Sequence, residues 1–295
     1  MNIISYEHAN LAKTAVALGK FQGLHKGHML LIDEIIRISH EKKVSSAVFT
    51  INMPSEKILH LPEERYNILE RKGIEFAVEC QFSKEFAAMT PEQFVREVLV
   101  ERLNVAFVCV GTDFRFGCNR EGNVDTLYRF GEIYNFEVIA FDKLKISDTV
   151  VSSSLLREKV LSGNMDEFCE YAGRYYCISG DVLFGKQIGR TIGFPTANIL
   201  PDDRKLLPPF GVYETYVIID GVQYKGVTNV GDNPTISGDN PVSIETNIID
   251  FDGNLYGRHV EVYFKRFLRP QVQFNNLEEL KKQINSDRNR VIMHQ

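Results

Sequence analysis

The sequence TAVALGKFQGLHKGH, residues Thr14 to His28, decides the fold of the first half of the chain. An apolar run ends at Gly19, and the segment from His28 to His40 then carries apolar residues at helical spacing. A strand, a glycine-containing turn and a helix in this order are typical of one unit of a parallel α/β sheet. The sequence therefore predicts such a unit near the beginning of the chain.

The same alternation of strand and helix continues through the first half. Strands are predicted at 44–51, 74–78, 105–110 and 136–141, and helices at 62–72, 90–103 and 125–134. The nearly uninterrupted apolar run at 105–110 is typical of a strand buried on both faces. We expect a Rossmann-like, doubly wound sheet whose ligands bind beyond the carboxyl ends of the strands, where Gly19 and Gly111 lie.

The second half has the pattern of an antiparallel sheet. After two short helices at 154–161 and 166–171, strands at 212–219 and 222–230 flank Asp220-Gly221, a dipeptide that favours a two-residue hairpin turn. Strands at 242–251 and 255–267 flank a second turn, and a helix at 277–285 follows. The sequence predicts a small antiparallel β-barrel with a C-terminal helix. We place the domains at residues 1–172 and 173–295.

Composition restricts the classes of ligand and partner. The 295 residues contain no apolar stretch long enough for a membrane helix and no signal sequence at the N-terminus, so a cytoplasmic protein is predicted. Five cysteines without a close pair favour reduced thiols. A net charge of -5 disfavours nucleic-acid binding. We expect small-molecule ligands, no nucleic acid or membrane partner, and a monomer or weak oligomer.

His25 and His28 are the first candidates for chemistry. Because they are three residues apart at the beginning of a helix, their side chains face the same side. Together with Gly19, Phe21 and Gly27 they form a candidate site for a polyphosphate, since glycines allow close approach of the backbone to the phosphates. The alternative is an incidental histidine pair.

Two further segments of the first half are candidate ligand sites. Ser153 and Ser154 can cap the helix that they open and donate to phosphate, and Arg157 supplies a planar donor for the same anion. Taken alone, an ordinary helix cap is the favoured interpretation. A loop that contains Asp113, Phe114, Arg115 and Phe116 suits a flat ring system. The alternative is a structural loop in which Asp113 pairs with Arg115.

The second half contains a glycine-rich segment from Gly185 to Asn198. Its glycines and cations, Gly185, Lys186 and Arg190, can fold over ATP, while Thr196 and Asn198 present oxygens suited to Mg²⁺ and phosphate. The chain has no P-loop motif of the Walker type. The alternative, a glycine- and proline-rich hairpin of the barrel, is the less favoured interpretation.

The order and spacing of these segments resemble the prokaryotic bifunctional riboflavin kinase/FAD synthetase family over nearly the whole chain. The resemblance implies that the first domain transfers the adenylyl group of ATP to FMN, which yields FAD, and that the second phosphorylates riboflavin to FMN, both with Mg²⁺. His25, His28 and Arg157 match the adenylyltransferase module, and the loop with Asp113 matches its flavin site.

The resemblance also assigns roles in the second domain. Glu245 aligns with the general base of the kinase, although by strand pattern alone a solvated carboxylate on the outer face is favoured. Arg269 and Phe274 match a segment near the flavin. Thr196 and Asn198 match the metal and phosphate positions.

The chain departs from the family pattern at three places. Gln22 stands where the family usually has an acid, residues 52–55 replace a Pro-His-Pro segment, and Asn247 replaces a common histidine. The first alternative is therefore the same fold with one active module, kinase or synthetase alone. The second alternative is a non-catalytic flavin-binding regulator. The joint presence of Thr196, Asn198 and Glu245 argues against it.

Overall fold

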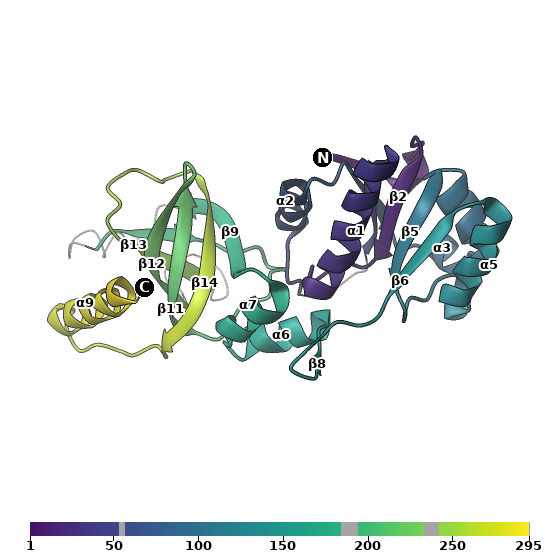
Figure 1. Cartoon of the computed structure of the whole chain (residues 1–295). Helices are drawn as coiled ribbons and strands as arrows, with labels where there is room; N and C mark the ends of the chain where they lie inside the picture. The colour runs from purple at the N-terminus through teal and green to yellow at the C-terminus, as the bar shows by residue number, and fades with distance from the viewer. Residues whose placement is uncertain (53–56, 184–193, 233–241, 295) are drawn as a thin grey trace. The chain divides into compact units, whose positions relative to one another are not determined.

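The computed structural model describes residues 1–52, 57–183, 194–232 and 242–294, and it divides the chain into two compact units (Figure 1). The first unit comprises residues 1–56 and 60–153, and the second comprises residues 57–59 and 154–295. Each unit has its own sheet and its own core. The two units are described separately below.

The first unit is a six-stranded parallel sheet with helices on both faces, as predicted. Its strands, in the order β1-β4-β3-β2-β5-β6, are β1 (Asn2–Ser5), β2 (Thr14–Gly19), β3 (Ser45–Asn52), β4 (Phe76–Gln81), β5 (Val105–Gly111) and β6 (Glu137–Phe141). Its helices are α1 (Lys26–Lys42), α2 (Pro62–Lys72), α3 (Lys84–Ala88), α4 (Pro91–Gln93), the π-helix η2 (Phe94–Val100) and α5 (Val124–Tyr134).

Strand β2 shows why both faces of this sheet are covered. Ala15 and Ala17 belong to the core cluster that contains Ile32 of α1, whereas Val16 and Leu18 belong to the cluster on the other face. All four of these strand residues are at most 2% exposed. A central strand that buries both faces is apolar at every position, which is the pattern of residues 15–18.

The strand order changes direction beside β2. From β2 the chain continues through β3 and β4 on one side, whereas β5 and β6 lie on the other. Gly19 and Gly111 are the last residues of the adjacent strands β2 and β5, so they flank this switch point. Ligands of doubly wound sheets bind at the carboxyl ends of the strands beside this switch point.

Two local features of the first unit differ from prediction. Thr90 and Gln93 form the expected capping box, but the helix that they begin continues as a π-helix from Phe94. Strand β1 (Asn2–Ser5), which pairs with β4, was not predicted. Its side chains are largely exposed apart from Ile4, which packs against the core, so this edge strand shows no apolar alternation in its sequence.

The second unit is a closed antiparallel barrel, and the predicted fold class is confirmed. The strands, in the order β10-β13-β12-β11-β14-β9, are β9 (Tyr176–Leu183), β10 (Thr196–Ile199), β11 (Gly211–Ile219), β12 (Val222–Asp232), β13 (Val242–Ile248) and β14 (His259–Arg269). The helices are α6 (Ser153–Leu161), whose first residue is assigned to the first unit, α7 (Met165–Ala172) and the C-terminal α9 (Leu277–Met293).

The hairpin turn at Asp220-Gly221 is confirmed, because both residues have positive φ, 51° and 79°. The predicted strands at 242–251 and 255–267 were wrong at the second turn, since β13 ends at Ile248 and β14 begins at His259. The connection between them leaves the sheet. Helix α9 is also longer than predicted and continues to Met293.

Candidate active sites

The turn from Gly19 to His28, here called the histidine turn, lies at the carboxyl end of β2 and opens α1. His25 is the N-cap of α1, and its Nδ1 accepts a hydrogen bond from the backbone N–H of His28 at 3.3 Å. The two imidazole rings stack, with centroids 3.7 Å apart and planes 17° apart. The structure therefore brings His25 and His28 together, as their spacing predicts.

Glycines give the histidine turn its shape. A Cβ on Gly27 would lie 3.1 Å from Nδ1 of His25, and one on Gly19 would lie 3.1 Å from the ring of Phe21. Phe21 is fully buried and has a φ of 46°, so its ring fills the inside of the turn. Without these glycines the rings of Phe21 and His25 could not keep their positions.

Ser153 packs against the same turn. A Cβ on Gly23 would lie 2.9 Å from Oγ of Ser153 and 3.3 Å from its Cα, so this serine is directly beside Gly23. The prediction that Ser153 and Ser154 cap the helix was wrong by one position, because α6 begins at Ser153. Both serines lie in its first turn, where backbone N–H groups point outward from the helix end.

Arg157 and Ser154 belong to the second unit and are described with it. Arg157 donates a hydrogen bond from Nη2 to the backbone carbonyl of Lys57, and Ser154 is exposed. Ser153 and Arg157 are four residues apart in α6, so they project from one face of that helix.

The loop after β5 contains the predicted flavin-binding residues. Phe114 stacks on Phe116, with ring centroids 5.7 Å apart, and Phe116 is a core residue only 7% exposed. Asp113 forms an ion pair with Lys143 at 2.9 Å, so its predicted alternative pairing with Arg115 was wrong. Arg115 is exposed and donates to the carbonyl of Phe114. Phe114, whose side chain is half-buried, therefore offers the exposed aromatic face of this loop, beside the switch point.

Sequence reasoning missed a polar cluster at the carboxyl ends of β3 and β4. Arg65 of α2 donates to Oδ1 of Asn52 at 3.0 Å and lies 3.4 Å from the carboxylate of Glu79. Asn52 and Tyr66 also donate to Glu79. Burial lowers the pKa of Arg65. Polar residues at the ends of two adjacent parallel strands were the signal that could have identified this cluster.

The kinase candidates lie on two paired strands of the second unit. Asn198 of β10 is directly opposite Glu245 of β13, and Thr196 is opposite Asn247. Since alternate residues of a strand share a face, these four side chains lie on one side of the sheet. We call this set the β10–β13 face. The structure thus brings together Thr196, Asn198 and Glu245, which the sequence separates by almost 50 residues.

Glu245 is not a solvated carboxylate. Its side chain is half-buried, and burial raises its pKa. Asn198 Nδ2 lies 3.3 Å from Oγ1 of Thr196 and donates to it. The amide nitrogen of Asn198 is thereby directed toward Thr196, and its oxygen is free to face elsewhere.

A cavity of about 620 Å³ adjoins the β10–β13 face. It is lined by residues 195–198 at the beginning of β10 and by the connection after β13, including Phe251, Asp252 and Asn254. This volume is in the usual range for small-molecule sites. The connection after Ile248, which was predicted as strand at 249–251 and 255–258 and as a turn at 252–254, thus forms one wall of the cavity.

The remaining predicted site residues of the second unit lie outside the β10–β13 face or outside the described residues. Arg269 binds the buried carboxylate of Asp287 through Nε and Nη2, at 3.0 and 2.8 Å, and Phe274 is half-buried. Gly185, Lys186 and Arg190 lie outside the described residues. Among the described residues no group of three or more His, Cys, Asp or Glu side chains could hold a metal ion.

Comparisons with known proteins show which family each half of the chain resembles. A family model described as FAD synthetase matches residues 7–155, and one described as riboflavin kinase matches residues 172–293. The chain is 32% identical over 283 residues to the bifunctional riboflavin kinase/FMN adenylyltransferase of Escherichia coli (strain K12), which covers 92% of this chain and 90% of that protein. The enzyme of the same description from Bacillus subtilis (strain 168) is 32% identical over 296 residues and covers 96% and 93%.

The chain belongs to this family of bifunctional enzymes. The family named from the sequence is therefore confirmed, with an FAD synthetase domain followed by a riboflavin kinase domain. The two models leave residues 156–171 unmatched, and these residues, in α6 and α7, lie in the second compact unit. The proposed domain boundary after residue 172 stays a prediction.

A solved structure also has this fold over the whole chain. A protein from Streptococcus pneumoniae, described as a macrolide-efflux protein, superposes with a TM-score of 0.88 at 28% identity and covers 99% of both chains. That description is of the other protein, and the similarity shows a shared architecture. No helix in the part of this chain that the structure describes has the length and apolar character needed to cross a membrane.

Proposed function

We propose that the second unit phosphorylates riboflavin on the β10–β13 face. The observation that carries this proposal is the pairing of Asn198 with Glu245, which sets a candidate base directly beside candidate ligands of MgATP. Mg²⁺ keeps few protein ligands and binds largely through phosphates and water, so one hydroxyl and one amide oxygen suit it. Thr196 and Asn198 would hold the metal, which would neutralise charge on the phosphates of ATP.

Glu245 acts as the general base in this proposal. It accepts the proton of the riboflavin 5′-hydroxyl while that oxygen attacks the γ-phosphorus, the bond from the γ-phosphorus to the bridging oxygen breaks, and ADP leaves. Burial makes the carboxylate a stronger base because it disfavours the charged form. The adjacent cavity receives the substrates.

We propose that the first unit adenylylates FMN at the histidine turn. An FMN phosphate oxygen attacks the α-phosphorus of ATP, and the bond to the β-phosphate breaks to release pyrophosphate. No covalent intermediate is needed, since alignment and charge stabilisation suffice. The positive end of the 17-residue helix α1, the two histidines and Ser153 supply donors for the phosphates.

The roles of the surrounding residues follow from this arrangement. Phe114 offers an aromatic face for the isoalloxazine ring, with Phe116 beneath it as support. The phosphate contact predicted for Arg157, which belongs to the second unit, stays a prediction. The proposed contacts of Arg269 and Phe274 with the flavin stay predictions, and Arg269 is held by its ion pair with Asp287.

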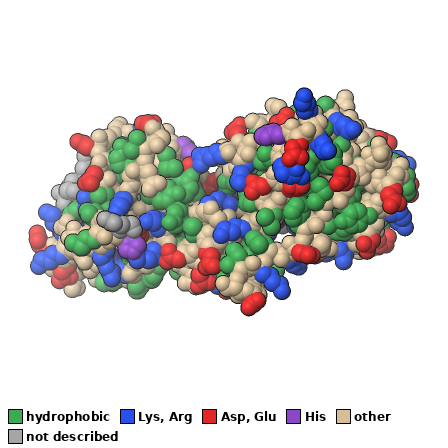
Figure 2. Space-filling view, viewed as in Figure 1, with side chains coloured by type: hydrophobic (Ala, Val, Ile, Leu, Met, Phe, Trp, Pro, Cys, Tyr) green, Lys and Arg blue, Asp and Glu red, His purple; other side chains and the backbone are tan. Residues whose placement is uncertain are grey.

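Small molecules are the proposed partners. On the face drawn in Figure 2, acidic and basic side chains are interspersed, which supports the view that the chain has no broad basic surface for nucleic acid there. The predicted monomeric or weakly oligomeric state and cytoplasmic location stay predictions.

One assay tests both activities. Purified chain is mixed with MgATP and either riboflavin or FMN, and the flavins are separated by chromatography. We expect FMN and FAD from riboflavin, and FAD from FMN. Accumulation of FMN without FAD would show that only the kinase is active. The replacement of the family's usual acid by Gln22 in the first unit is the reason for this alternative. Asn198→Ala serves as a control that lowers FMN formation only.

A further inference from the structure

The amide of Asn247 connects three elements of the kinase unit. Its Nδ2 donates to the backbone carbonyl of Pro195 at 2.8 Å, and its Oδ1 accepts from Nη1 of Arg288 at 2.6 Å. Asn247 itself is 4% exposed. A side-chain amide that uses its donor and its acceptor at once, away from water, fixes the spacing of both partners. Strand β13 is thereby tied to the beginning of β10 and to helix α9.

Arg288 also covers the residue before Pro195. Its guanidinium carbon lies 5.5 Å from the ring centre of Phe194, which is 8% exposed. A planar guanidinium can stack on an aromatic ring while it donates from its edge. Arg288 therefore holds Phe194 by stacking and, through Asn247, the carbonyl of Pro195. These two residues directly precede Thr196.

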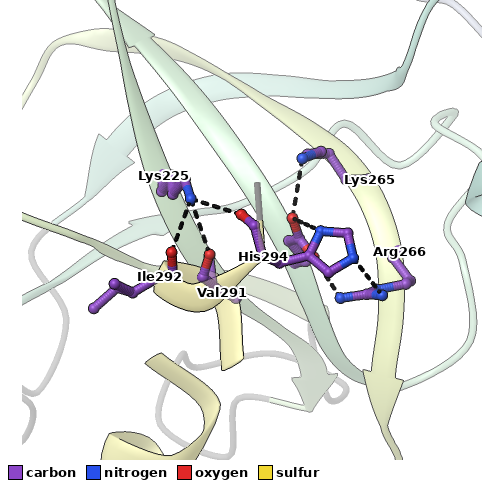
Figure 3. A network of polar contacts seen from close by, with 7 residues as sticks. Lys225, Lys265, Arg266, Val291, Ile292 and His294 are labelled. Atoms are coloured by element: carbon purple, nitrogen blue, oxygen red, sulfur yellow. Dashed lines mark hydrogen bonds and ion pairs between the residues drawn. The ribbon is translucent and has the colours of Figure 1, made fainter. Parts of the chain in front are cut away.

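Helix α9 presents Arg288 from a well-anchored position. Its Val291 is fully buried in a cluster with residues of the barrel, and its Asp287 binds Arg269 of β14. Figure 3 shows the third attachment, in which Nζ of Lys225 points at the end of the helix and donates to the carbonyls of Val291, Ile292 and His294 at 2.8–3.2 Å. An arginine on a helix attached at three points has little freedom to move away from Asn247.

We propose that Arg288 and Asn247 are positioning residues of the kinase site. Through the carbonyl of Pro195 and the ring of Phe194, they set the entry of β10, and with it the distance of Thr196 and Asn198 from Glu245. The inference rests on the proposed role of Thr196 and Asn198 toward MgATP. Neither Arg288 nor Asn247 touches the reacting atoms, so their loss weakens the binding of MgATP more than it removes the base.

The test uses the full chain with Arg288→Met, Arg288→Lys and a matched control, Arg290→Met, which alters an exposed arginine two residues further along the same helix. Arg288→Met should raise the KM for MgATP in riboflavin phosphorylation about tenfold, as expected for loss of a charged hydrogen bond. The KM for riboflavin and the adenylylation of FMN should stay unchanged. Arg288→Lys should recover part of the loss, and Arg290→Met should behave as the parent chain.

A double variant decides whether the two residues act as one device. If both work through their shared hydrogen bond, Asn247→Leu combined with Arg288→Met raises the KM for MgATP by less than the product of the two single effects. Effects that multiply would overturn the proposal. So would a lowered unfolding temperature of Arg288→Met with an unchanged KM, since that result marks a purely structural role. If Arg288→Met weakens the barrel, the KM for MgATP of Arg288→Lys replaces it in the test. The FMN adenylylation of each sample then shows whether the rest of the chain is folded.

The same kinetics separate this inference from the proposed function. The free Mg²⁺ concentration that gives half-maximal kinase rate is measured for Asn198→Ala and for Arg288→Met. If Asn198→Ala leaves this concentration unchanged, the metal role of Asn198 is wrong. If Asn198→Ala raises it and Arg288→Met does not, the metal role stands and the positioning role is wrong.

Discussion

The histidine turn takes its shape from the backbone, whereas the β10–β13 face takes its shape from strand pairing. In the first unit, glycines leave room for the rings of Phe21 and His25, and the helix end supplies N–H groups. In the second, Asn198 and Glu245 meet because their strands are in register. The first site is thus local in sequence, and the second depends on contacts across the barrel. Because the two activities are assigned to different parts of the chain, residues 7–155 and 172–293, a variant in either part carries the other activity as an internal control.

The largest effect is expected from Glu245→Gln. The amide keeps the size of the side chain but cannot accept the proton, so FMN formation should fall by about 10²–10⁴-fold. FMN adenylylation by the same sample should be unchanged, as measured by chromatography of the flavins. Equal loss of both activities would contradict the assignment of Glu245 to the kinase alone.

The converse change is His28→Ala in the histidine turn. It removes one imidazole of the stacked pair but leaves the N-cap acceptor of His25 in place. Loss of one preorganised phosphate donor should lower FMN adenylylation by about 10²–10³-fold. Riboflavin phosphorylation should be unaffected. A variant with normal adenylylation would show that the histidine pair is incidental.

The buried ion pair of Asp287 with Arg269 allows the stability of the second unit to be lowered by itself. Asp287, which is 1% exposed, accepts three hydrogen bonds from Arg269, so Asp287→Ala should destabilise the second unit by about 3 kcal/mol or more. The matched control is Asp33→Ala in the first unit. Its ion pair with Lys72 is exposed and worth about 1 kcal/mol at most. Unfolding in urea is monitored through the loss of each activity. Only in Asp287→Ala should kinase activity be lost at a lower urea concentration than in the parent chain.

The contrast between local and non-local sites also explains what the sequence could reveal. The fold class, the strand–turn–helix at residues 14–28 and the stacked pair of His25 and His28 were predictable, because each follows from residues close together in the chain. The pairing of Asn198 with Glu245 was suggested only by the family resemblance, since register across a barrel has no signature in either strand alone.

Surroundings that depend on tertiary packing were less predictable. Phe116 was interpreted as a ligand residue because an aromatic side chain in a glycine-rich loop has the same pattern whether it faces a ligand or the core. The ion pair of Arg269 with the buried carboxylate of Asp287, 18 residues further along the chain, was likewise not predictable from the segment around Arg269. Asn247 was noted only as a replacement, because its contacts with Pro195 and Arg288 depend on tertiary packing.

The smallest effect expected is a shift of the kinase pH profile. Burial raises the pKa of Glu245 above its ordinary value of 4.5, and only the ionised form can act as a base. The value of kcat/KM for riboflavin should therefore fall with decreasing pH around a midpoint above 4.5, and this limb should be absent from the residual activity of Glu245→Gln.

The raised pKa of Glu245 also lowers the free energy of unfolding at neutral pH. Since the folded state binds this proton more tightly than the unfolded state, Glu245 favours folding at low pH, and that contribution is lost as the pH rises through the folded pKa. Glu245→Gln should therefore unfold at a higher urea concentration than the parent chain at neutral pH, and the difference between them should shrink as the pH falls toward 4.5. The histidine turn has no such buried carboxylate among the residues that shape it. A kinase midpoint at or below 4.5 would mean that Glu245 is solvated when it works, and that the barrel face does not depend on burial for its base.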